Sequence, residues 1–116
     1  MGPIRWKEIP IEKIGEGVER QVIWGDQCTL ARFQFAKGVH IPPHKHEAEQ
    51  QSYVLEGAMR ISAAGRDFEL HAGEVLVIPT WIEHEVWFLE ACVLLDFFAP
   101  SRNDWKEGRQ AYLKGD

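Results

Sequence analysis

The chain has 116 residues, of which 45% are hydrophobic and 27% are charged, and this composition is typical of one globular domain with a single core. The net charge of -5 argues against a general nucleic-acid binder, because such a protein needs a basic face. No stretch reaches membrane-spanning length and the N-terminus lacks a signal peptide's apolar segment, so we expect a cytoplasmic protein with neither nucleic acid nor membrane as a partner.

The N-terminal segment is apolar and has little barrel of its own to cover it. It carries Ile4, Trp6, Ile9 and Ile11. A segment of this kind can pair with the sheet of a second copy, which satisfies its backbone and covers an edge strand. We therefore predict a homodimer.

Most of the chain alternates short apolar runs with turn residues, which is a β pattern. The run 75–78 is continuously apolar, as a strand buried on both faces would be, and the run 93–98 is again nearly all apolar. Many short strands joined by tight turns predict an all-β sandwich or jelly-roll barrel. The expected strands lie near residues 32–35, 53–55, 59–62, 66–71, 75–78, 84–88 and 93–98.

The C-terminal tail has a helical pattern. Ser101 and Asp104 have the spacing of a capping box, and Trp105, Tyr112 and Leu113 fall on one face of a helix. A short C-terminal helix packed on the barrel is expected.

The two cysteines of the chain are too few for a disulfide scaffold, so free thiols in a reducing compartment are expected.

Two sequence blocks point to a metal site. His44 and His46 lie two residues apart, so their side chains share a face on a strand, and His84 can complete the set from a distant segment. Gln50 is preferred to Gln51 because alternation turns the two to opposite faces. Three imidazoles and an amide oxygen suit a divalent transition ion, so the predicted ligands are His44, His46, Gln50 and His84. The blocks read G-x5-H-x-H-x3-Q-x6-G from Gly38 to Gly57 and G-x5-P-x4-H from Gly73 to His84.

Asp96 is the second candidate for chemistry, because it interrupts the apolar run 93–98. Burial of an unpaired carboxylate is costly, so this residue is either paired or functional. One interpretation is a salt bridge to Arg102 or Arg60. The other is a proton-transfer group near the metal, with Phe98 on the same face as a platform for the substrate.

The two blocks resemble the two conserved motifs of the cupin superfamily. This resemblance implies a cupin-type double-stranded β-helix, a jelly-roll barrel with a short C-terminal helix, as one domain over residues 1–116. Three positions depart from the usual motifs: Gln50 replaces Glu, Trp81 replaces Gly and Phe88 replaces Asn. Trp81 either narrows the mouth of the pocket or caps the end of the barrel.

The Gln variant is similar to a subgroup of small single-domain (cupin type-2) cupins of pectin degradation, which linearise unsaturated uronates. Members of this subgroup tend to carry an Asp-x-Phe followed by a Pro-x-Arg, and here these residues are Asp96, Phe98, Pro100 and Arg102. The resemblance implies an isomerase or tautomerase with Asp96, Phe98 and Arg102 as catalytic residues.

The neutral ligand set indicates the class of chemistry. Without a ligating Glu the ion keeps its double charge, which favours a small-molecule carboxylate as substrate or ligand. We expect one divalent ion per chain, with Ni, Zn, Mn and Fe as candidates. Two other classes remain open: an iron-dependent dioxygenase, and a non-catalytic metabolite-binding or sensor cupin in which Asp96 forms a salt bridge.

Overall fold

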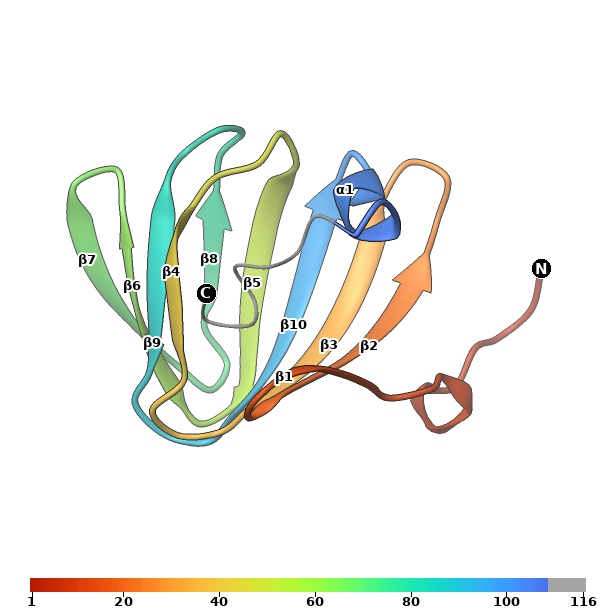
Figure 1. The fold of residues 1–116 in the computed structure, drawn as a ribbon, viewed down its shortest axis with the longest axis horizontal. Coiled ribbons are helices and arrows are strands. Elements are labelled where there is room, and N and C mark those ends of the chain that lie inside the picture. The colour runs from red at the N-terminus through yellow and green to blue at the C-terminus, as the bar shows by residue number, and fades with distance from the viewer. Residues whose placement is uncertain (109–116) are drawn as a thin grey trace.

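The computed structural model describes residues 1–108, which form two antiparallel sheets that face each other (Figure 1). One sheet has the strand order β1-β2-β3-β10-β5-β8 and the other β4-β9-β6-β7. This is the predicted jelly-roll architecture. The strands are β1 (Glu12–Gly15), β2 (Val18–Trp24), β3 (Thr29–Phe35), β4 (His40–His44), β5 (Glu49–Glu56), β6 (Ala58–Ala63), β7 (Arg66–His71), β8 (Val75–Ile78), β9 (His84–Phe88) and β10 (Cys92–Ala99).

The core lies between the two sheets and is built from alternate residues of each strand. In β3 and β10 the buried positions alternate with more exposed ones, as the period of two requires. Phe35 of the larger sheet stacks on Phe88 of the smaller sheet with ring centroids 3.9 Å apart. Phe88 replaces the usual Asn of the cupin motif, so this departure supplies a contact that joins the sheets.

Gly57 connects β5 to β6 and explains the last glycine of the first block. Its φ is +89°, a left-handed value, and a Cβ at this position would overlap the carbonyl oxygen of Ala91. Only glycine combines this backbone conformation with such a close approach.

The expectation that residues 75–78 are buried on both faces is wrong. They form β8, an edge strand of the six-stranded sheet, and Val75 and Val77 are 51% and 50% exposed. Only Ile78 of this strand is buried. A continuous apolar run does not reveal whether a strand is central or at an edge of a sheet. The side chains on both faces of the strand are apolar in both situations.

Three strands, β1, β2 and β4, were not indicated by the sequence pattern. β4 contains Pro42 and Pro43, and prolines count against a central strand because they cannot donate to the ladder. β4 lies at an edge of the four-stranded sheet, where prolines are tolerated.

The predicted C-terminal helix is present as α1 (Asn103–Lys106), and its Trp105 is buried. The expected capping box is wrong: Arg102 is the N-cap, without a side-chain cap, and Ser101 instead hydrogen bonds to Thr29 at 2.8 Å. Tyr112 and Leu113 lie outside the described residues. Trp105 packs edge-on against Phe98 with ring centroids 5.1 Å apart.

Among residues 1–108 no helix is long and apolar enough to cross a membrane.

The N-terminal segment runs away from the barrel before β1 and includes a 3₁₀ turn at Trp6–Glu8 (Figure 1). Gln21 holds the segment by donating from Nε2 to the carbonyl oxygens of Trp6 and Ile9 at 2.7 and 2.9 Å. Cys28 and Cys92 are both free, and Cys92 is buried.

Candidate metal centre

The three predicted histidines meet at one end of the barrel. His44 is the last residue of β4 and His84 the first residue of β9, and the two are partners in the antiparallel ladder. His46 lies in the connection from β4 to β5. One ring nitrogen from each of the three lies within 4.8 Å of the others. The β4–β5 and β8–β9 loops lie at the upper end of the barrel in Figure 1, so this end holds the centre.

A backbone carbonyl fixes the tautomer of each ring. The Nδ1 atoms of His44, His46 and His84 lie 2.8–2.9 Å from carbonyl oxygens two residues away. A carbonyl oxygen only accepts, so each Nδ1 carries the hydrogen and each Nε2 keeps its lone pair. Metal-binding histidines are usually oriented by such a second contact. The accepting carbonyls belong to Pro42, Ala48 and Ile82.

The rings are held neutral. Burial, together with the nearby His84, lowers the pKa of His44 to about 3, and burial with the charge of Arg102 lowers the pKa of His46 to about 4. Burial also lowers the pKa of His84. Neutral imidazoles bind a cation at neutral pH without first losing a proton. The buried Nε2 of His84 has no hydrogen-bond partner among residues 1–108, as expected for a nitrogen that faces an ion.

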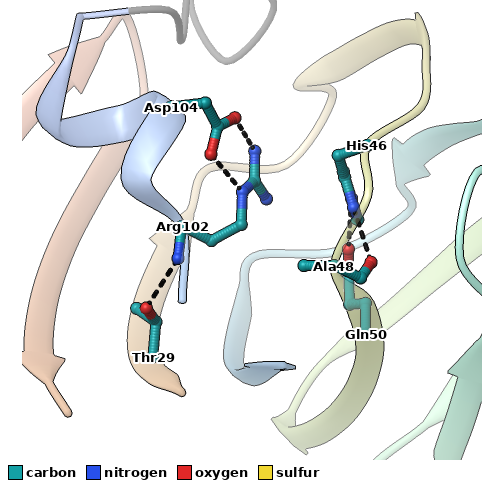
Figure 2. A network of polar contacts seen from close by, with 6 residues as sticks. All are labelled: Thr29, His46, Ala48, Gln50, Arg102 and Asp104. Atoms are coloured by element: carbon teal, nitrogen blue, oxygen red, sulfur yellow. Dashed lines mark hydrogen bonds and ion pairs between the residues drawn. The ribbon is translucent and has the colours of Figure 1, made fainter. Parts of the chain in front are cut away.

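Gln50 adds an oxygen to the set. Its Oε1 lies 3.0 Å from Nε2 of His46, and its Nε2 donates to Ser52 Oγ at 2.8 Å (Figure 2 shows the first contact). Because the neutral His46 carries its hydrogen on Nδ1, this pair of atoms brings two acceptors face to face. Two lone pairs repel at this distance unless a cation lies beside both. The chemistry of the donor set therefore fits a divalent ion. Gln51 is exposed.

Asp96 lies inside the barrel on β10, directly opposite Ser52 of β5. Ser52 Oγ donates to its Oδ1 at 2.6 Å. Burial raises the pKa of Asp96 to about 6, against the opposing effects of the hydrogen bonds from Ser52 and Gln50 and of the charge of Arg102. Of the two arginines proposed as alternative partners, Arg60 lies 4.4 Å over the ring of Trp87, and Arg102 forms an ion pair with Asp104 while its charge also acts on Asp96.

Arg102 is a buried cation at the same end of the barrel. Its Nε and Nη2 donate to the two carboxylate oxygens of Asp104 at 2.8 and 2.7 Å, and its backbone N–H donates to Thr29 (Figure 2). The guanidinium lies 4.7 Å over the ring of Phe98. These contacts fix a positive charge next to the aromatic ring.

A small cavity of about 30 Å³ lies among these groups. Its polar lining is His44, Gln50, Ser52, His84, Asp96 and Arg102, with Phe98 among the apolar residues. The structure thus places Asp96, Phe98 and Arg102 around the same space as the metal candidates.

Trp81 lies at the mouth of the site. It is 57% exposed and lines an open hollow outside the cavity together with Lys45, His46 and Arg102. Its φ is +61°, in the region that favours glycine, the usual residue here in the cupin motif. Its backbone N–H donates to the carbonyl oxygen of His46 at 2.9 Å, so this loop holds the His46 segment in place.

Ser52 is the polar residue of the site that the sequence interpretation missed. The signal was present: Ser52 lies two residues after Gln50, so on a strand it faces the same way. A polar side chain at an inward position next to the buried Val54 marks a specific contact rather than packing.

Comparison with known proteins gives consistent matches. The cupin domain family matches residues 31–98. The pectin degradation protein KdgF of Dickeya dadantii is 35% identical over 101 residues, which are 84% of this chain and 92% of the relative. A solved RmlC-like cupin from Shewanella frigidimarina superposes with a TM-score of 0.80 at 30% identity, covering 85% of this chain and 90% of that one. KdgF from Halomonas sp. superposes with a TM-score of 0.80 at 26% identity, covering 85% and 94%.

Proposed function

The chain belongs to the cupin domain family, and from this premise we propose that it is a metal-dependent enzyme that opens and tautomerises an unsaturated uronate. The observation that carries the metal is the pair of acceptors His46 Nε2 and Gln50 Oε1, which face each other at 3.0 Å beside the buried, unpartnered Nε2 of His84. We assign His44, His46, Gln50 and His84 as the ligands of one divalent transition ion per chain, with Ni, Zn, Mn and Fe as candidates.

When bound, the ion supplies Lewis acidity at a substrate oxygen. Asp96 then transfers the proton. Ring opening of an unsaturated uronate needs removal of the hydroxyl proton at the hemiacetal carbon, cleavage of the bond from that carbon to the ring oxygen, and protonation of the enol carbon. One carboxylate with a pKa near 6 suits both transfers at neutral pH, and the reaction is an isomerisation with no net loss of protons.

Phe98 and Arg102 bind the substrate in this scheme. The Phe98 ring supplies a flat apolar surface for the sugar ring, and the guanidinium next to it attracts the carboxylate. Asp104 keeps the guanidinium oriented through two hydrogen bonds. The choice of a uronate rests on the names of the relatives, which place one of them in pectin degradation.

The direct test is the loss of the carbon–carbon double-bond absorbance of an unsaturated galacturonate on addition of the protein. We expect loss with metal-loaded protein and little with chelator-treated protein, and restored activity when metal is returned. The same sample in an oxygen electrode should consume no oxygen. Consumption of oxygen together with unchanged uronate would instead identify an oxygenase.

Gln50→Glu is expected to keep the metal and to weaken binding of carboxylate ligands. The added negative charge cancels part of the field of the ion at short range, where Coulomb interactions are largest. Metal analysis and calorimetric titration with a uronate measure the two effects. Unchanged or tighter carboxylate binding would argue against direct contact between the ion and the anion.

We also propose that the protein is a homodimer joined through its N-terminal segment. Ile4 and Ile11 are 57% and 60% exposed and lie on a segment that extends beyond the barrel (Figure 1). Light scattering at micromolar concentration should give twice the mass of the chain for the full-length protein. Protein without residues 1–11 should give the mass of a single chain. A single-chain mass for the full-length protein would contradict the proposal.

A further inference from the structure

We propose that Ser52 is a positioning residue that keeps the amide of Gln50 turned with its oxygen toward the histidines. The inference rests on the proposed metal function, because the amide must be oriented only if its oxygen is a ligand. It adds to the site a residue that touches neither the ion nor the reacting atoms of the substrate.

Ser52 occupies the point between the two functional side chains. It is 1% exposed, and on β5 it pairs in register with Asp96 of β10. Its Oγ is 2.6 Å from Asp96 Oδ1 and 2.8 Å from Gln50 Nε2. Inward-facing residues directly opposite each other in antiparallel strands are close enough for such a contact, so the register of the sheet builds the link.

The donor-to-acceptor direction is the same in both hydrogen bonds, from Gln50 to Ser52 and from Ser52 to Asp96. Ser52 has a single hydroxyl hydrogen, which it donates to the carboxylate, a group that only accepts. Ser52 therefore presents only lone pairs to Gln50, and the amide turns its NH₂ group toward the hydroxyl, an orientation that the hydrogen bond between Gln50 and Asp96 also favours. The carbonyl oxygen then points the other way, to Nε2 of His46.

The opposite amide orientation is unfavourable at both ends. It would set the carbonyl oxygen of Gln50 against the lone pairs of Ser52 and the NH₂ group against the ion. An amide nitrogen that carries two hydrogens has no lone pair to offer a cation. Contacts that orient a ligand in this way typically change metal affinity by about 10- to 100-fold.

The test is a double-mutant cycle with Co²⁺ as the probe, read by competition against a chelator and by the visible spectrum of the bound ion. Ser52→Ala in the wild-type background should weaken Co²⁺ binding by about 10- to 100-fold and change the spectrum. In the Gln50→Glu background the same change should have little effect, because a carboxylate presents an oxygen whichever way it is turned.

A matched pair controls for packing. Ser52→Thr and Ser52→Val have the same shape and differ in the hydroxyl, so the Thr variant should bind Co²⁺ more tightly than the Val variant by a similar factor. Equal losses from Ser52→Ala in both backgrounds, or equal affinities of the Thr and Val variants, would overturn the inference. Wild-type protein that binds no Co²⁺ and no other divalent transition ion would overturn the proposed metal site as well, and this outcome is distinct from the other two.

Discussion

Asp96→Asn protein is expected to turn over an unsaturated uronate at least about a hundredfold more slowly than wild type, with its fold and metal content unchanged. Asn has nearly the same shape and can accept the hydrogen bond from Ser52, but it cannot take a proton from the substrate. The measurement is a rate at saturating uronate, combined with metal analysis of both proteins.

The thermal melt of the same variant separates a functional carboxylate from a structural one. Burial raises the pKa of Asp96 from 3.8 to about 6, so the native state holds more protons than the unfolded state between these values. The stabilisation that Asp96 contributes through its raised pKa is fully present below pH 3.8, declines as the pH rises through 6 and is lost above it. At pH 7 metal-free Asp96→Asn should therefore melt at the wild-type temperature or above. Removal of a salt-bridged aspartate would instead lower the free energy of unfolding by about 3–5 kcal/mol. A large drop in melting temperature, with full activity in the remaining folded protein, would refute the catalytic role.

The raised pKa of Asp96 also predicts how turnover depends on pH at the acidic side. As the pH falls through about 6, the carboxylate gains a proton and can no longer act as a base, so turnover should decline. A bound cation stabilises the charged form, which places this decline at or below pH 6. The decline should be absent from the residual activity of Asp96→Asn.

His44→Ala combined with His84→Ala is expected to reduce bound metal from one ion per chain to near zero. The two rings supply two of the proposed donors from adjacent strands, and the remaining His46 and Gln50 leave too few neutral ligands to hold an ion. The fold should survive, because the hydrophobic core between the sheets does not include these rings. Elemental analysis and a circular dichroism melt test both statements.

His40→Ala is the matched control for this variant. His40 lies on the same strand as His44 but is exposed and pairs with Glu85 at 2.6 Å, outside the histidine cluster. It should keep one ion per chain. Stoichiometric metal in the double variant, or loss of metal in His40→Ala, would show that the ligands are assigned wrongly.

Much of this arrangement was predictable because it depends on local periodicity. A spacing of two residues from His44 to His46 gives the two side chains a shared direction on any extended segment, and alternation separates Gln50 from Gln51. Asp96 was noticed because a charge in an apolar run is costly unless it has a role. These arguments use only neighbours along the chain.

The unpredicted features depend on pairing between distant strands. Ser52 meets Asp96 because β5 pairs with β10 in one particular register, which no local pattern specifies. The edge position of Val75 and Val77 likewise follows from strand order, not from their apolar character. Arg102 forms an ion pair with Asp104, two residues away, and its charge also acts on Asp96.

The carbonyl contacts of the three histidines make the centre preorganised. Each Nδ1 donates to a carbonyl only two residues away, so each ring is held by its own stretch of backbone and needs no ion to orient it. The conformational entropy of ordering these side chains is lost during folding and is not lost again on binding. Amide hydrogen exchange of the β4–β5 and β8–β9 loops should therefore be almost the same with and without metal, and added metal should stabilise the protein only by mass action.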